Sequence, residues 1–136
     1  MTSIFADTGY WIALLNPQDA LHHKALSVSA KFSSARIITS EMVLVELLNS
    51  FSETGSQSRQ AAARLVEVLR ATARVKVVAQ SPEQFETALQ SYKRADDKHW
   101  SITDCASFQI MERERVRAAF THDRHFAQAG YETLLR

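Results

Sequence analysis

Short apolar runs alternate along this chain with longer segments in which apolar residues recur at helical spacing. A short apolar run bounded by polar or turn residues is typical of a buried strand, whereas apolar residues on one helical face are typical of an amphipathic helix. The pattern predicts strands at residues 4–6, 36–38, 75–78 and 118–121. It predicts helices at residues 22–33, 41–51, 58–73, 82–94 and 103–115.

Several polar residues stand where these helices are expected to begin. Ser81 followed by Pro82, with a glutamine three residues after the serine, is a helix-start signal. Ser101 and Asp104 have the spacing of a capping box. Gly55 is expected to turn the chain between two helices.

The order of these elements indicates the class of fold. Strands that are separated by helices pair in parallel through crossover connections, because a hairpin cannot join parallel strands. The chain has no repeat, linker or low-complexity tract. We therefore predict one layered α/β domain over residues 1–136.

Composition indicates the class of protein and its compartment but does not indicate its function. With 136 residues, 46% hydrophobic and 23% charged, the chain has the make-up of an ordinary globular protein. Its single cysteine, Cys105, excludes an internal disulfide framework and suits a reducing cytoplasm. No segment has the length and apolarity of a membrane span, and the N-terminus lacks the pattern of a signal peptide. The net charge of +1 neither indicates nor excludes a nucleic-acid partner.

Three aspartates are placed where a ligand is expected. In an open parallel sheet, ligands bind beyond the carboxyl ends of the strands. Asp7 directly follows the first predicted strand, and Asp123 stands two residues after the last one. Asp104 lies at the start of a predicted helix, where an acid is otherwise explained as a cap. Asp7 and Asp123 are thus expected at the same edge of the sheet.

Glu46 is the fourth candidate acid. It lies within the segment MVLVELL, in which its neighbours are apolar, and a buried carboxylate needs a partner. The alternative is that Glu46 occupies a solvated stripe opposite Leu44 and Leu47. Asn49 shares the side of Glu46, so the pattern leaves both interpretations open.

If Asp7, Glu46, Asp104 and Asp123 meet, their like charges repel strongly in a partly desolvated cleft. A divalent cation would relieve that repulsion, and an all-oxygen site suits Mg²⁺ or Mn²⁺. Such an ion activates water and neutralises charge on a phosphodiester. The acids therefore suggest phosphodiester hydrolysis, although 15 acids in the chain make accidental groupings easy to find.

Four motifs together resemble the PIN-domain ribonucleases, and among them the VapC-type toxins of toxin-antitoxin pairs. The motifs are IFADT, MVLVELLN, WSITDC and FTHDRHF, and they follow the order and typical separations of that family over nearly the whole chain. The resemblance implies a three-layer α/β/α fold with a central parallel sheet of four to five strands. It also implies metal-dependent endonucleolytic cleavage of RNA.

The resemblance assigns roles to particular residues. It implies that Asp7, Glu46, Asp104 and Asp123 form the metal-binding and catalytic set, with Mg²⁺ or Mn²⁺ as the cofactor. Thr8 or Thr121 would support the metal or the phosphate, while Ser101 caps its helix and His99 is a candidate phosphate contact. It further implies a cognate antitoxin and a homodimer. The helix surface expected to receive a partner is an apolar patch of Tyr10, Trp11, Leu14 and Leu15.

Three further residues in or near the motifs are not assigned to the acidic set. His125 stands where family members often carry a further acid, so the resemblance does not extend a second-metal role to this position. Asp97 reads equally as a site residue or as part of a solvated loop. Cys105 is expected to be a packing residue behind Asp104.

Two other classes of function compete with the nuclease. Asp7-Thr8-Gly9 is the tripeptide of aspartic proteases, but that motif belongs to an all-β fold and this chain is largely helical in pattern. The second alternative is an α/β interaction protein whose acids are structural. Metal titration distinguishes that protein from a nuclease.

Overall fold

The computed structural model describes residues 2–136, and within them a five-stranded sheet forms the centre of the molecule. All neighbouring strands pair in parallel, in the order β3-β2-β1-β4-β5. The strands are Ser3–Ala6 (β1), Arg36–Ser40 (β2), Val75–Val78 (β3), Ala118–Phe120 (β4) and Glu132–Thr133 (β5). The predicted α/β class with a parallel sheet of four to five strands is confirmed.

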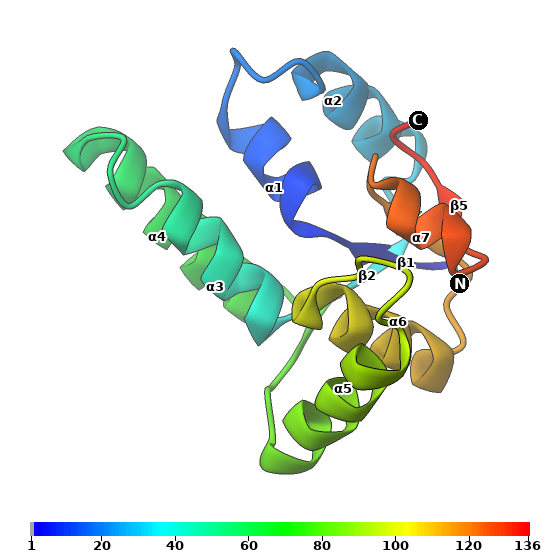
Figure 1. Ribbon diagram of the computed structural model, residues 1–136. Helices are drawn as coiled ribbons and strands as arrows, with labels where there is room; N and C mark the ends of the chain where they lie inside the picture. The colour runs from blue at the N-terminus through cyan, green and yellow to red at the C-terminus, as the bar shows by residue number, and fades with distance from the viewer. Residues whose placement is uncertain (1) are drawn as a thin grey trace.

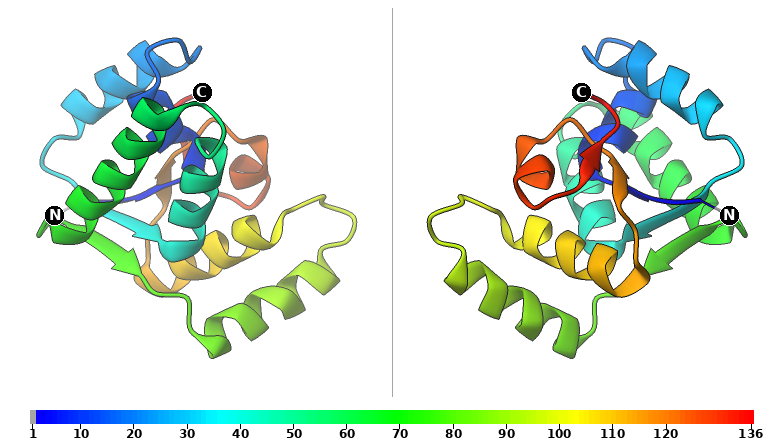
Figure 2. Two further views of the ribbon diagram at one scale, coloured as in Figure 1. Left: turned by 90° about the vertical axis from the view of Figure 1, so that its left-hand side faces the viewer. Right: turned by 90° about the vertical axis from the view of Figure 1, so that its right-hand side faces the viewer.

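Helices cover both faces of this sheet, which gives the three expected layers. Figure 1 shows α1 and α2 on one side of the sheet and α5 and α6 on the other, and Figure 2 shows α5 packed along the outside of α6. None of the helices within residues 2–136 is long and apolar enough to cross a membrane. The helices are Thr8–Leu15 (α1), His22–Lys31 (α2), Glu41–Ser50 (α3), Ser56–Ala71 (α4), Pro82–Arg94 (α5), Ile102–Glu114 (α6) and Arg124–Gln128 (α7).

Aromatic side chains fill the core between the sheet and the helices. Phe5, Phe120 and Phe126 are fully buried, and burying one such side chain contributes about 2 kcal/mol to the free energy of unfolding. The ring of Tyr10 stacks on Phe120 with 4.4 Å between centroids, and its hydroxyl lies 2.6 Å from Ser29 Oγ. The stacking fixes α1 against β4, and the hydroxyl contact fixes α1 against α2.

The patch predicted after Asp7 is therefore only partly a free surface. Tyr10 and Trp11 are 5% and 4% exposed and belong to the core, which corrects their assignment to a partner surface. Leu14 and Leu15 are half-buried against the same core. Tyr10 packs on Phe120 of β4, and Trp11 Nε1 donates to Thr39 Oγ1 of β2 at 3.4 Å, so both aromatic side chains face the sheet.

Helix starts follow the predicted signals. The Ser81 hydroxyl accepts a hydrogen bond from the Gln84 amide at 3.1 Å, with Pro82 in the first turn of α5. Gly55 precedes α4 with φ of 103°, a left-handed conformation that glycine adopts without strain. The expected Ser101 and Asp104 capping box is also present.

The order of the strands indicates where a ligand is expected to bind. The chain leaves β1 toward β2 and β3 on one side and later returns to place β4 and β5 on the other. The carboxyl ends of β1 and β4 therefore flank the topological switch point, where open α/β sheets bind ligands. The Asp7 amide donates to the Phe120 carbonyl at 3.2 Å, so the two strand ends are joined there.

Candidate metal centre

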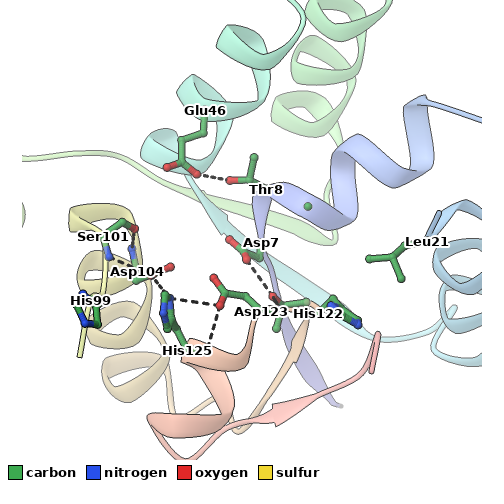
Figure 3. Close-up of a pocket in the computed structure, with 12 residues that line it drawn as sticks. Asp7, Thr8, Leu21, Glu46, His99, Ser101, Asp104, His122, Asp123 and His125 are labelled. Carbon is green, nitrogen blue, oxygen red and sulfur yellow. Dashed lines mark hydrogen bonds and ion pairs between the residues drawn. The ribbon is translucent and has the colours of Figure 1, made fainter. Parts of the chain in front are cut away.

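A cleft of about 410 Å³ opens at the carboxyl ends of β1 and β4. All four candidate acids line it, and they come from four different segments of the chain (Figure 3). The predicted supporting residues line it too. The lining residues are Asp7, Thr8, Gly9, Leu21, Glu46, His99, Ser101, Asp104, Thr121, His122, Asp123 and His125.

Asp7 lies at the centre of this group, directly after β1. Its Oδ2 accepts a hydrogen bond from Thr121 Oγ1 at 2.9 Å, and the same Oγ1 accepts from the Asp123 amide at 3.1 Å. Thr121 is 1% exposed, so this link is sheltered from water. Thr121 thereby ties the end of β1 to the loop after β4.

Burial raises the pKa of Asp7 from 3.8 to about 7. The Thr8 amide and the Thr121 hydroxyl favour the charged form, whereas the nearby charges of Asp104 and Asp123 oppose it. A cation bound beside Asp7 would stabilise the ionised carboxylate and so offset the cost of burying its charge.

Asp104 occupies the third position of α6 and completes the capping box. The Ser101 amide donates to its Oδ2 at 3.1 Å, and its own amide donates to Ser101 Oγ at 2.9 Å. Burial raises the pKa of Asp104, as does the charge of Asp123, while hydrogen bonds from Ser101 and His125 lower it. Asp104 is thus a cap and a member of the acidic cluster at once.

His125 is the residue whose position the sequence left open. Asp123 caps α7 by accepting from the His125 amide at 2.8 Å, and this turn aims the imidazole back at the acids. His125 Nδ1 lies 3.1 Å from Asp104 Oδ2 and 3.3 Å from Asp123 Oδ1. One ligand atom from each of these three residues lies within 4.8 Å of the others. The sequence pattern did not predict the contact of His125 with Asp104, because it joins two segments that are 21 residues apart.

Glu46 faces the same cleft from α3 but lies outside that three-residue cluster. Thr8 Oγ1 donates to Glu46 Oε1 at 2.6 Å, so the carboxylate has the partner that the buried interpretation required. It is also half-exposed beside the solvated Val45, as the stripe interpretation required. Glu46 thus has a hydrogen-bond partner, as the buried interpretation predicts, and partial exposure to solvent, as the other interpretation predicts.

The donor set fits a hard divalent cation. Each of the four acids uses one carboxylate oxygen in the hydrogen bonds described above, and its second oxygen has no side-chain partner among residues 2–136. Unpaired carboxylate oxygens that gather in one cleft are the ligands that Mg²⁺ and Mn²⁺ prefer. Asp7, Asp104, Asp123 and Glu46 are therefore able to hold such an ion.

Residues around the cleft differ in how closely they approach it. His99 is exposed and lines the cleft with φ of 60°, an uncommon backbone conformation for a residue other than glycine. Asp97 is absent from the lining, and its side chain is 70% exposed and 3.7 Å from Lys98 Nζ. The solvated-loop interpretation therefore describes Asp97. Cys105 is fully buried, which raises the pKa of its thiol and agrees with a packing role.

The sequence and the fold both match a known family. The PIN domain family matches residues 4–131. The chain belongs to the PIN-domain family. It is 34% identical over 131 residues to the 23S rRNA-specific endonuclease VapC20 of Mycobacterium tuberculosis, a match that covers 94% of this chain and 95% of that protein. The resemblance to VapC-type proteins is thus confirmed.

Two solved structures support the assignment of the fold. The crystal structure of M. tuberculosis VapC20, a sarcin-ricin loop cleaving toxin, gives a TM-score of 0.82 at 31% identity and covers 94% of this chain and 95% of that one. FitAcB from Neisseria gonorrhoeae gives a TM-score of 0.71 at 15% identity, with 96% and 95% covered, and shares the fold.

The same fold removes the protease alternative. Asp7-Thr8-Gly9 runs from the end of β1 into the first turn of α1, within a parallel α/β sheet. The all-β fold that accompanies this tripeptide in aspartic proteases is not the fold of residues 2–136.

Proposed function

We propose that this PIN-domain protein is a Mg²⁺-dependent endoribonuclease, with Mn²⁺ as an alternative metal, and the toxin of a toxin-antitoxin pair. The observation that carries the proposal is the meeting of Asp7, Glu46, Asp104 and Asp123 in one cleft at the switch point of the sheet. Similarity to VapC20 over 94% of the chain supports the same reaction class.

We assign different roles to the four acids of the cleft. A bound cation would neutralise charge on the phosphodiester and activate a water molecule. Asp7, Asp104 and Asp123 would hold the ion, with Thr121 fixing Asp7 through its hydroxyl. Asp7 and Glu46 both lie outside the cluster of Asp104, Asp123 and His125, but Thr121 joins Asp7 to Asp123, whereas Glu46 is bonded only to Thr8. We therefore assign Glu46 Oε2 the role of accepting the proton of the attacking water.

The proposed substrate is a structured RNA. VapC20 is named as specific for 23S rRNA, and its structure is that of a sarcin-ricin loop cleaving toxin. We extend a ribosomal RNA loop to this chain as the first substrate to test, and such a substrate places the protein in the cytoplasm. His99, exposed at the edge of the cleft, is our candidate phosphate contact.

The direct test is cleavage of a labelled 23S rRNA hairpin loop with EDTA, Mg²⁺ or Mn²⁺. We expect cleavage only with metal, and we expect Asp104→Asn to lower its rate by about 1,000-fold because the charge of a ligand is lost. Asp97→Asn is the matched control, since its carboxylate is 70% exposed and absent from the cleft. Equal cleavage by wild type and Asp104→Asn would contradict the assignment of the acids.

The competing interpretation is a non-catalytic interaction protein with structural acids. Calorimetric titration with Mn²⁺ distinguishes the two when no RNA is cut. Binding that Asp104→Asn weakens favours a nuclease whose substrate has not been found. Equal or absent binding favours the interaction protein.

Partners are proposed from the family and from one surface. Val45 and Leu48 on α3 are 54% and 37% exposed, and both line a hollow of about 160 Å³ against α4 and β3. Figure 1 shows α3 and α4 side by side. We assign this surface to a homodimer and expect a separate antitoxin to regulate the toxin.

We expect light scattering to give a dimer mass for wild type and a monomer mass for Val45→Asp, because a buried unpaired charge opposes association. Val68→Asp is the matched control, since Val68 is 53% exposed on α4 but does not line the hollow. A monomeric wild type would leave the surface to the antitoxin alone.

A further inference from the structure

The imidazole of His125 lies within hydrogen-bonding distance of two of the candidate acids. Its Nδ1 is 3.1 Å from Asp104 Oδ2 and 3.3 Å from Asp123 Oδ1, and its side chain is 19% exposed. Figure 3 shows the ring between these two carboxylates, with the carboxylate of Asp7 next to them. A nitrogen donor therefore lies among the oxygen donors of this cleft.

These separations suit shared coordination as well as hydrogen bonding. Neighbouring ligands on an octahedral ion with bonds of about 2.1 Å lie about 3 Å apart. His125 Nδ1 already has that separation from one oxygen of each aspartate. The turn that caps α7 holds the ring in place through the bond from the His125 amide to Asp123. A cation bound between these three atoms would take the place of any hydrogen on Nδ1, while the amides of Ser101 and His125 keep their bonds to the two carboxylate oxygens.

We infer that His125 Nδ1 is a direct ligand of the cation in this cleft, and that the mixed nitrogen and oxygen donor set makes the site prefer Mn²⁺ over Mg²⁺. The inference rests on the proposed metal-dependent function and adds a ligand and a metal preference to it. Mg²⁺ strongly favours oxygen donors, whereas the first-row transition metals also accept imidazole. One nitrogen among carboxylates therefore shifts selectivity without changing the charge of the acids.

Two other histidines provide internal controls. His99 and His122 line the same cleft, but neither belongs to the group of atoms within 4.8 Å of one another. Both are exposed, so replacing them leaves the core unchanged. A nitrogen signal that depends on His125 and not on these residues identifies the ligand.

The experiment is pulsed EPR of Mn²⁺ bound to the full-length protein, with calorimetric titrations of Mn²⁺ and Mg²⁺. We expect coupling to a coordinated nitrogen in wild type, in His99→Gln and in His122→Gln, and its loss in His125→Gln and His125→Asp. We expect Mn²⁺ to bind wild type about tenfold more tightly than Mg²⁺, and this ratio to fall toward one in His125→Asp, which restores an oxygen donor.

The outcomes separate this inference from the proposed function. Mn²⁺ binding without nitrogen coupling, or with coupling that persists in His125→Gln, overturns the assignment of His125 and leaves the metal-dependent nuclease intact. Binding of Mg²⁺ without binding of Mn²⁺ overturns the inference alone, and failure of wild type to bind either ion overturns both. Circular dichroism of each variant confirms that it is folded before its titration is compared.

Discussion

Asp7→Asn is expected to make the protein more stable in EDTA at pH 8 and to abolish RNA cleavage. Burial raises the pKa of Asp7 to about 7, so at pH 8 the folded protein holds an ionised carboxylate in an unfavourable environment beside Asp104 and Asp123. Asparagine removes that charge and still accepts the hydrogen bond from Thr121. We expect the free energy of unfolding to rise by about 1–3 kcal/mol.

Thermal unfolding in EDTA measures the gain in stability, and the hairpin assay with Mn²⁺ measures the loss of cleavage. Removing one metal-directed charge should lower the rate by about 1,000-fold. Asp97→Asn makes the same chemical change at an exposed carboxylate and should leave both quantities unchanged. A less stable Asp7→Asn would show that the acids are structural partners instead of a group of like charges awaiting a cation.

The sequence predicts the elements with strong periodicity and misses the others for physical reasons. Four strands lie within apolar runs, and five helices begin within two residues of the expected positions. Helix α1 was missed because its sequence TGYWIALL is apolar at nearly every position after the glycine and shows no polar face. Strand β5 has two residues, and its pairing depends on a hydrogen bond from the Glu132 amide to the Arg117 carbonyl, a long-range contact without a local signal.

Some features of the candidate site could likewise be predicted from the sequence, and others could not. The convergence of Asp7 and Asp123 follows from strand order, because parallel strands end at one edge. The capping box of Ser101 and Asp104 is a local pattern and was predicted as such. The approach of His125 to Asp104 depends on how α7 packs beside α6, and no pattern within the motif FTHDRHF reports that. Local spacing therefore predicts caps, and topology predicts edges, but contacts between side chains of distant segments require the folded structure.

Metal affinity is expected to fall steeply on acidification, with Asp7 as the main cause. A proton and a cation compete for the same carboxylate. With a pKa of about 7, about 90% of Asp7 is ionised at pH 8 and about 3% at pH 5.5, which predicts an affinity for Mn²⁺ about 30-fold weaker at the lower pH. The raised pKa of Asp104 acts in the same direction.

The stability of the protein in EDTA should change in the opposite sense. The native pKa of Asp7 lies above its ordinary value of 3.8, so the folded state binds more protons than the unfolded state between about pH 4 and pH 7. This contribution to stability is therefore present at low pH and is lost as the pH rises through about 7. The difference in unfolding free energy between Asp7→Asn and wild type should accordingly be small near pH 4 and reach its full size by pH 8.

Calorimetry in buffers of different ionisation enthalpy measures both the affinity and the protons released. We expect Asp7 alone to release close to one proton per Mn²⁺ near pH 6, with any proton on Asp104 or His125 adding to that number, and close to none above pH 8, where Asp7 is already ionised. In Asp7→Asn the residual affinity should depend less on pH, because only Asp104 and the imidazole of His125 then exchange a proton for the cation. An affinity equal at pH 5.5 and pH 8 in wild type would show that the Asp7 carboxylate is not a ligand. Joined to the stability difference, this measurement assigns the titration to one side chain, since only Asp7 changes between the two proteins.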